Sequence, residues 1–366
     1  MKPVKLFLCG DVMTGRGVDQ ILRQPSEPHI HEGYLRNAVD YVRLAERANG
    51  PIPRGVADAY IWGDALDELA RARPDARIIN LETAVTRSDD GVNKGINYRM
   101  HPANVGSLTA AGIDCCELAN NHVLDWGEAG LLETLQVLHD AALHTAGAGK
   151  NRNEAQAPAA LTRSDGGRVL VYSLGTEDSG IPRSWAASAA QPGVAFLADL
   201  SSRSADRLAE RIGAEKRAGD IVVVSIHWGG NWGYRIPIEQ QQFAHRLIDA
   251  GGVDVLHGHS SHHPKGIERR GGKLILYGCG DFINDYEGIA GHDEFRGDLG
   301  LMYLPQIDAE TGQLMAMELV AMRRRRLRLE RASDVDSRWL CGVLNAEGRR
   351  LNTSFELQPG ARLLMN

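Results

Sequence analysis

With 366 residues, 43% of them hydrophobic, the chain has enough apolar material for one large buried core or two smaller ones. The formal net charge is −6, so the sequence lacks the overall basic charge that is typical of proteins that bind nucleic acid. The five cysteines form no CxxC pair, and we expect free thiols that pack as small core residues in a reducing compartment.

The N-terminal residues enter an apolar, strand-like run at once, without the pattern of a signal peptide before it. No apolar run elsewhere reaches the roughly 20 residues that a membrane-spanning helix needs. We therefore expect an intracellular, cytoplasmic protein that has no membrane partner and binds no nucleic acid.

Short β-branched or leucine-rich runs alternate with amphipathic helical patterns, which is typical of an α/β sandwich. The expected strands are Lys5–Cys9, Arg77–Leu81, Cys115–Ala119, Val169–Ser173, Ile221–Ile226, Val253–Leu256, Lys273–Tyr277 and Leu299–Leu304. The expected helices are Val56–Arg71, Gly127–Ala141, Ser202–Lys216, Pro237–Ala250 and Ser337–Glu347.

We interpret residues 1–366 as a single domain. Residues 14–55 carry few periodic apolar positions and are expected to form a lid insertion, and residues 310–366 a C-terminal extension of the same domain. A second segment, residues 283–298, is rich in Asp, Glu, Gly and His. Long segments without periodicity usually shape or cover an active site in a compact enzyme, and we expect the same of these two.

Polar clusters follow six of the expected strands. They are Gly10-Asp11, Asn80-Leu81-Glu82, Asn120-Asn121-His122, His227-Trp228-Gly229, the run His257–His263, and Gly278–Phe282. In α/β sheets the carboxyl ends of the strands form the edge where ligands bind. Carboxylates and imidazoles bind divalent cations, and thiolates are almost missing from these clusters. The sequence therefore predicts a divalent-metal site at this edge.

The same segments resemble the signature blocks of CapA-type proteins, a family named for poly-γ-glutamate capsule synthesis within the calcineurin-like metallophosphoesterase superfamily. The matching blocks are GDVMTGRG (10–17), NLET (80–83), ELANNHVLDWG (117–127), SIHWG (225–229), LIDAG (247–251), HGHSSHHPKGIE (257–268) and YGCGDFIND (277–285). The resemblance implies a calcineurin-like two-sheet β-sandwich flanked by helices, with a metal site at the carboxyl ends of the strands. It also implies metal-binding roles for Asp11, Asn121, His227, His259 and His262 and a catalytic role for His122.

Two positions depart from the dinuclear phosphoesterase pattern. Met13 stands where the Asp-x-His block has its histidine, and Asn80-Leu81-Glu82 replaces the second aspartate block. With Glu82 as a further ligand, we expect one firmly held ion, which is Mn, Ca or Zn. Hydrolysis of phosphate esters by two metal ions is correspondingly in doubt.

Several acid/base groups are expected near that ion: Asp11, His262, His122 with Asp125, and His292 with Asp293 or Asp298. Such groups can remove and return the proton at a carbon next to a carbonyl. The chain is similar to a soluble branch of CapA-like proteins that epimerise the C-terminal residue of lasso-peptide precursors, and we predict that activity on a peptide substrate. The alternatives are a metal-dependent hydrolase of phosphoester or amide bonds, and a poly-γ-glutamate accessory protein.

Substrate contacts are expected from Trp228, Trp232 and Tyr234, whose rings either cradle a side chain or pack under the sheet edge. Arg99 is a candidate for binding a substrate carboxylate, although a solvated loop fits equally well. The basic run Arg323–Arg331 is typical of a charged edge strand rather than of a patch for an acidic peptide. The oligomeric state stays open.

Overall fold

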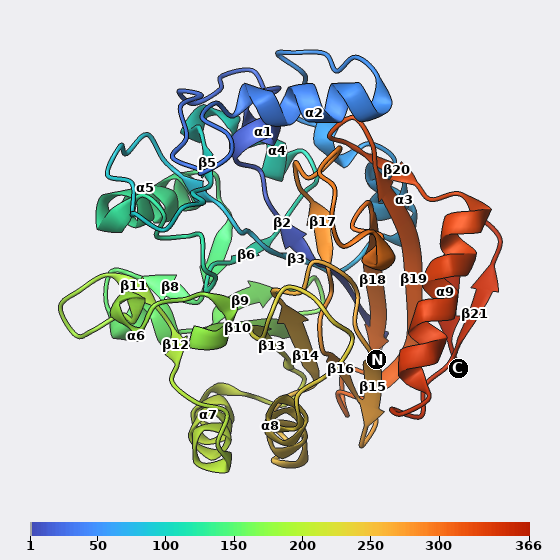
Figure 1. Ribbon diagram of the computed structural model, residues 1–366. Coiled ribbons are helices and arrows are strands. Elements are labelled where there is room, and N and C mark those ends of the chain that lie inside the picture. The colour runs from blue at the N-terminus through green and yellow to red at the C-terminus, as the bar shows by residue number, and fades with distance from the viewer. Residues whose placement is uncertain (1) are drawn as a thin grey trace.

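Two β-sheets packed face to face form the centre of the molecule, a computed structural model that describes residues 2–366 (Figure 1). The nine-stranded sheet has the order β21 (Phe355–Gln358), β22 (Arg362–Met365), β19 (Leu314–Arg324), β18 (Leu299–Ile307), β1 (Val4–Cys9), β3 (Ala76–Asn80), β6 (Cys115–Glu117) and β7 (His144–Ala146), with β20 (Leu329–Arg331) beside β19. The seven-stranded sheet has the order β12 (Phe196–Leu197), β10 (Arg168–Thr176), β13 (Ile221–His227), β14 (Val255–His259), β16 (Lys273–Leu276) and β15 (Ile267–Arg270), with β9 (Ala159–Thr162) beside β10.

Short strand pairs and helices complete the fold. The pairs are β2 (Asp11–Val12) with β17 (Asp281–Ile283), β4 (Ala84–Val85) with β5 (Arg99–Met100), and β8 (Ala148–Gly149) with β11 (Gly193–Val194). The α-helices are α1 (Arg16–Asp19), α2 (Val39–Asn49), α3 (Ala65–Ala72), α4 (Gly106–Thr109), α5 (Gly127–Asp140), α6 (Arg152–Gln156), α7 (Ser202–Glu215), α8 (Ile238–Asp249) and α9 (Asp334–Gly348). The 3-10 turns are η1 (Tyr60–Trp62), η2 (Pro102–Asn104), η3 (Glu177–Ser179), η4 (Arg183–Trp185) and η5 (Asp293–Phe295).

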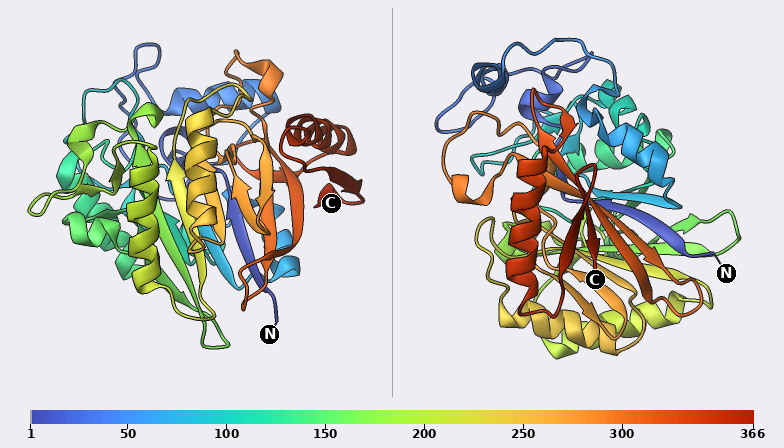
Figure 2. Two further views of the ribbon diagram at one scale, coloured as in Figure 1. Left: turned by 90° about the horizontal axis from the view of Figure 1, so that it is seen from below. Right: turned by 90° about the vertical axis from the view of Figure 1, so that its right-hand side faces the viewer.

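Alternation along the strands divides the core into layers. On β1, Leu6 and Leu8 face the interior between the two sheets, whereas Phe7 and Cys9 face the helices outside. On β13 the odd residues 221 and 223 face the same interior, and the even ones, 222 to 226, face α7 and α8. Figure 2 shows α7 and α8 covering the outer face of the seven-stranded sheet, with α2 and α3 on the opposite side of the molecule. Because strand side chains alternate with a period of two, each sheet can bury both faces.

This arrangement confirms the predicted α/β sandwich of two sheets flanked by helices. The five thiols are free, as expected from the cysteine pattern. Within residues 2–366, no helix combines the length and the apolar character needed to cross a membrane.

Two predicted elements differ from the structure. The single helix expected over Val56–Arg71 is interrupted at Gly63, whose φ is +44° and where a side chain would overlap the carbonyl oxygen of Leu329. The basic run 323–331 is also not one edge strand. It contains the end of β19, which lies inside the sheet, then a turn with positive φ at Arg326 and Leu327, and then β20.

Residues 14–55 contain α1 and α2, which lie at the top of Figure 1. Residues 310–366 supply most of β19, all of β20 to β22 and helix α9, which extend the larger sheet past β18. The division of the chain into a domain, a lid and an extension remains a prediction.

Candidate functional site

Strands from both sheets direct polar residues toward one edge of the sandwich. In the larger sheet β1, β3 and β6 are parallel to one another, and in the smaller sheet β13 and β14 are parallel. The turns after these strands therefore come together although their residues lie as much as 250 positions apart in the sequence. Five of the six polar clusters predicted from the sequence lie at the ends of these strands, and the sixth, Gly278–Phe282, follows β16, which is parallel to β14.

Asp11 is fully buried and is held from three directions. Its backbone N–H donates to the carbonyl of Gly280 at 2.8 Å, and its Oδ1 accepts from Asn80 Nδ2 at 2.7 Å. Its Oδ2 accepts from the backbone N–H of Ser260 at 3.3 Å, a residue with φ of +85°. A non-glycine residue with positive φ is a strained conformation that persists where the surroundings require it. Burial favours a higher pKa for Asp11, but the His259 side chain and the charge of His227 lower it to about 2.

His227, Asn121 and Glu82 form the second part of the cluster. His227 Nε2 lies 3.1 Å from Asn121 Oδ1 and 3.7 Å from Glu82 Oε1, and its Nδ1 lies 3.5 Å from Asn80 Nδ2. Burial lowers the pKa of His227 to about 3, so the ring is neutral at pH 7 and keeps a lone pair. Burial and the nearby Asp11 carboxylate raise the pKa of Glu82 well above its usual range.

His259 is oriented by a buried carboxylate, Glu117. His259 Nε2 lies 3.1 Å from Glu117 Oε2 and 2.8 Å from Ser225 Oγ, which leaves Nδ1 facing Asp11 Oδ1 at 3.5 Å. Glu117 also lies 3.2 Å from His257 Nδ1, and the other nitrogen of His257 lies 2.8 Å from the carbonyl oxygen of Cys9. These three side chains meet the spacing of a metal cluster, and Glu117 Oε2 has no hydrogen-bond partner. The nitrogens that face it are already engaged, however: His257 Nδ1 lies 3.4 Å from Glu117 Oε1, and His259 Nε2 bonds with Ser225 Oγ. We therefore interpret Glu117 and His257 as support for His259 rather than as a separate metal site.

The residues around Asp11 fit a divalent cation. Glu82 Oε2 and His259 Nδ1 are buried and have no hydrogen-bond partner in the structure. Leaving buried polar atoms without a partner is costly, and an ion between them would satisfy both. Asp11, Asn121 and His227 add a carboxylate, an amide oxygen and a neutral imidazole. Mixed oxygen and nitrogen donors suit first-row transition metals.

A histidine–aspartate pair lies beside this donor set. His122 Nδ1 lies 2.6 Å from Asp125 Oδ2, and His122 Nε2 lies 3.8 Å from Glu82 Oε1. The Asp125 carboxylate is fully buried and also bonds to Lys94 Nζ at 2.7 Å and to the backbone N–H of Tyr98 at 2.6 Å. The Tyr98 ring stacks on His122 with centroids 3.9 Å apart. Burial lowers the pKa of His122 to about 4 despite the Asp125 charge, so the imidazole is neutral at pH 7.

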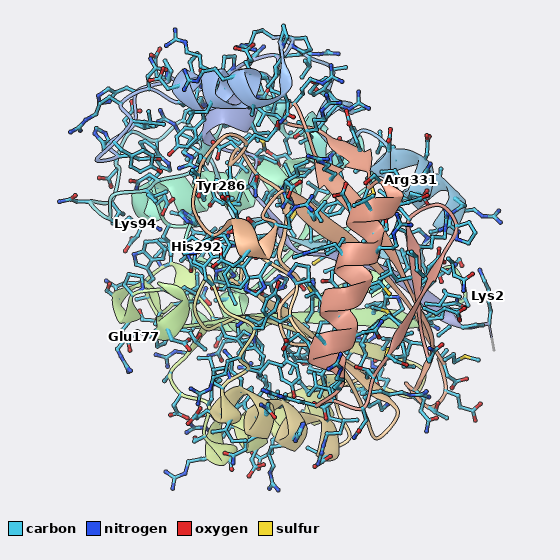
Figure 3. All side chains as sticks on the ribbon, turned by 45° about the vertical axis from the view of Figure 1, so that its right-hand side comes forward. Lys2, Lys94, Glu177, Tyr286, His292 and Arg331 are labelled. Carbon is cyan, nitrogen blue, oxygen red and sulfur yellow. The ribbon has the colours of Figure 1, made fainter. Side chains whose placement is uncertain are left out.

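A second pair, His262 with Asp281, lines a cavity. His262 Nδ1 is 2.9 Å from Asp281 Oδ1, and Asn284 Nδ2 donates to Asp281 Oδ2 at 2.8 Å. Burial favours a lower pKa for His262, but the Asp281 carboxylate raises it above its ordinary value. The cavity has a volume of about 540 Å³ and is lined by His262, Asp281, Tyr98, Tyr286 and the loop over residues 287–298. Figure 3 labels Tyr286 and His292, which both line it.

The structure brings together most of the residues that the sequence singled out. The predicted ligands Asp11, Glu82, Asn121, His227 and His259 form one cluster through the contacts given above. Of the predicted acid/base residues, His122, Asp125 and His262 lie next to it. The metal-binding and catalytic roles of these residues remain predictions.

Other predicted site residues lie elsewhere. His292 does not pair with Asp293 or Asp298: its ring stacks on Trp232 at 4.2 Å, because the Asp298 carboxylate is already bound by Arg296. Of the predicted substrate-binding rings, Trp232 lines the cavity, whereas Trp228 is buried against Phe243 and α8.

Two further residues that were predicted to contact the substrate do not line the cavity. The Tyr234 ring packs on His263 and Phe295 and does not line the cavity. The Arg99 guanidinium lies over Trp126 and bonds to Asp89 at 2.7 Å, so it does not face the cavity.

Sequence reasoning missed Glu117, Asn80 and Asp281 as functional residues. Each lies inside a recognised block of sequence. No local pattern, however, pairs an amide or a carboxylate with a partner on another strand. The charged Glu117 at an inward-facing position next to two cysteines was the available hint. The role of Lys94 beside Asp125 depends on a loop fold that periodicity does not predict.

The fold and the site together define a class of protein, an α/β sandwich with a buried cluster of carboxylate, amide and imidazole groups beside a cavity. The sequence profile of the family described as bacterial capsule synthesis protein PGA_cap matches residues 5–286. The chain belongs to this family. It is 47% identical to a probable polyglutamine synthesis accessory protein of Mycobacterium tuberculosis, over 97% of this chain and 94% of that protein.

Other relatives are more distant. The chain is 28% identical to the PGA biosynthesis protein CapA of Bacillus subtilis, over 75% of this chain and 62% of that protein. Among solved structures, a phosphatase from Mycoplasma pneumoniae has a TM-score of 0.48 at 13% identity and covers 88% of this chain and 94% of its own.

Proposed function

We propose that this protein is a metal-dependent accessory enzyme of glutamate- or glutamine-polymer synthesis, and that it cleaves amide bonds in the polymer chain. The observation that carries the proposal is the 47% identity, across nearly the whole chain, to a protein described as an accessory to polyglutamine synthesis. The cluster around Asp11 lies next to His262, which lines a cavity of about 540 Å³, and this position supports an enzymatic rather than a purely structural role.

In this proposal the cation is held by Asp11, Glu82, Asn121, His227 and His259, with Glu117 orienting His259. A divalent cation bound there supplies Lewis-acid polarisation of an amide carbonyl. His262, which lines the cavity, acts either as a further ligand or as an acid. Its contact with Asp281 favours the acid role, because the carboxylate stabilises the protonated ring.

In this proposal each of the two histidine–carboxylate pairs carries out one proton transfer. His122 is neutral at pH 7 and takes a proton from the attacking water at Nε2, while Asp125 holds the Nδ1 proton. His262 gives a proton to the leaving amide nitrogen as the carbon–nitrogen bond breaks, which yields a carboxylic acid and an amine.

Epimerisation at a peptide Cα is the second candidate. The presence of a neutral imidazole and a separate imidazole with a raised pKa favours it, since proton removal and return need a base and an acid. The same groups are used for hydrolysis, so the arrangement of residues does not separate the two reactions.

The test uses the full-length protein, freed of metal by a chelator and reloaded with Mn²⁺, Zn²⁺ or Ca²⁺. It is incubated in D₂O with oligomers of γ-linked glutamate and of α-linked glutamine, and the products are analysed by mass spectrometry. Metal-dependent fragments support amide hydrolysis. Deuterium at Cα without fragments supports epimerisation instead, and neither result with any of the three metals would overturn an enzymatic function.

A matched pair of variants checks the proposed acid/base group. Asp125→Asn removes the carboxylate that holds His122, and we expect at least about a hundredfold loss of turnover with metal binding retained. Asp140→Asn, at the exposed end of α5, is the control and should leave turnover unchanged.

A further inference from the structure

The arginines and carboxylates that line the cavity beside His262 are equal in number. The arginines that line it are Arg16, Arg296, Arg323 and Arg324, and the carboxylates are Asp281, Glu287, Asp293 and Asp298. Sites that attract charged chains usually present an excess of one sign. The equal numbers here argue against selection of a polyanion by the cavity.

Two of these arginines already form ion pairs with carboxylates of the protein itself. Arg16 is buried and bonds to Asp285 at 2.5 Å and to Glu32 at 2.8 Å. Arg296 bonds to Asp298 at 2.8 Å and to Asp336 at 2.7 Å. A substrate carboxylate would have to displace these partners before either guanidinium could bind it in a bidentate manner.

The other two are also engaged. Arg323 lies 3.2 Å from the same Asp298 carboxylate. Arg324 is buried and donates from Nη1 to the carbonyl of Asp281 at 2.5 Å and from Nη2 to those of Gly297 and Leu299. Arg324 therefore holds the two ends of the loop over residues 284–298 together, and its terminal nitrogens are occupied by protein.

Part of the exposed lining of the cavity is apolar. Within residues 2–366, eight large hydrophobic side chains are strongly exposed, and three of them line this cavity: Tyr34 at 64%, Ile96 at 36% and Ile289 at 39%. They come from three separate segments of the chain, and we call these three side chains the rim. Exposed apolar groups that line a cavity with charged walls indicate contact with a ligand that extends beyond it.

The Trp232 and His292 rings, whose centroids are 4.2 Å apart, stack on each other and form another part of the cavity wall. Flat rings and amide groups pack well against each other, and an amide also finds hydrogen-bond partners in the paired charges of the wall. A chain without net charge satisfies both features at once.

We infer that the cavity binds the end of an uncharged, amide-rich chain such as a run of glutamine residues, whose following residues lie across Tyr34, Ile96 and Ile289. This inference rests on the proposed function, because it names the substrate class of the same site. It selects the amide form of the polymer over the polyanionic glutamate form.

The test compares two end-labelled, α-linked decamers, one of glutamine and one of glutamate, by fluorescence anisotropy with the full-length protein. We expect the glutamine decamer to bind at least about tenfold more tightly at both about 50 and about 300 mM NaCl. Tighter binding of the glutamate decamer, weakening with salt, would overturn the inference. So would the absence of measurable binding of the glutamine decamer at about 1 mM protein.

A pair of double variants tests the rim. Ile96→Ser with Ile289→Ser should weaken binding of the glutamine decamer about tenfold and leave a glutamine dimer unaffected, because the dimer does not reach the rim. Met315→Ser with Val335→Ser removes apolar side chains of similar exposure that do not line the cavity, at 58% and 66%, and should change neither. Equal effects of the two pairs would contradict a role for the rim.

These measurements need no turnover, so they separate the inference from the proposed function. Tight, rim-dependent binding of glutamine chains without metal-dependent cleavage would remove the proposed reaction and keep the substrate class. Cleavage of glutamate chains bound as tightly as glutamine chains would keep the reaction and remove the inference.

Discussion

At the scale of single residues, the cluster around Asp11 depends on side chains that each position more than one neighbour. Asn80 donates to Asp11 and lies near His227, so one amide positions both. Glu117 fixes which nitrogen of His259 faces Asp11. In metal sites the partner of a ligating histidine sets its tautomer and orientation, and Glu117 has the position for that role.

The first prediction concerns the proposed ligands themselves. His227→Ala removes a neutral imidazole from the cluster, and we expect divalent-metal affinity to fall by at least about a hundredfold. Isothermal titration of the metal-free protein with Mn²⁺ and Zn²⁺ measures it. His139→Ala, on the exposed face of α5, is the control. Unchanged affinity in His227→Ala would remove this residue from the metal site.

The second prediction isolates the supporting carboxylate. Glu117→Gln keeps the size of the side chain but lets the amide donate toward His259, which favours the wrong tautomer. Metal affinity should fall about 10- to 100-fold while His227 and Asp11 remain in place. The same titration measures the effect, and circular dichroism checks the fold. A variant that folds and binds metal like the original protein would show that Glu117 has only a packing role.

At the scale of elements, the site depends on how closely β2 and β17 approach each other. β1 ends at Cys9, and Gly10 then passes so near Gly280 that a side chain at Gly10 would overlap the Gly280 carbonyl. That close passage allows Asp11 to bond to the Gly280 carbonyl and to point at His259. Glycine is required at Gly10 for space rather than for its backbone angles.

The third prediction follows from this close approach. Gly10→Ala forces the two turns apart, and we expect it to lower the free energy of unfolding by about 1–3 kcal/mol and to weaken metal binding as well. Chemical denaturation and titration measure the two effects. Gly33→Ala provides the matched control, because nothing lies within 4 Å of a side chain there. Equal stability of the two variants would contradict the steric account.

At the scale of the whole molecule, helix α3 is tied to the C-terminal strands through one buried carboxylate. Glu68 bonds to Arg71 at 2.9 Å, to Arg362 at 2.6 Å and also to Arg331. Burial favours a higher pKa for Glu68, but Arg71 and Arg331 lower it below its ordinary value of 4.5. The last strands of the larger sheet, β20 and β22, are joined in this way to a helix near the start of the chain.

The fourth prediction is a pH dependence of stability. Since the folded pKa of Glu68 is depressed, the unfolded chain binds more protons, and stability falls as the pH drops below about 4.5. Glu68→Gln should cost about 1–3 kcal/mol at pH 7, and this difference should shrink as the pH falls through that range. Urea denaturation at several pH values measures both. A difference that is independent of pH would show that packing rather than charge is responsible.

Local sequence patterns were enough to predict the alternation of strands and helices and the clustering of Asp11, His227 and His259 at the strand ends. These features follow from local periodicity and from the rule that parallel strands end at one edge, which depend on nearby residues only. The signature blocks of the sequence were also enough to identify the family.

Which polar groups become partners depends on how the chain folds in three dimensions. Glu117 meets His257 and His259 from a different sheet, His292 stacks on Trp232 rather than pairing with an aspartate, and Arg99 turns away from the cavity. Hydrogen bonds and ion pairs are set by distances of a few ångströms between segments far apart in the chain, and no local pattern encodes those distances.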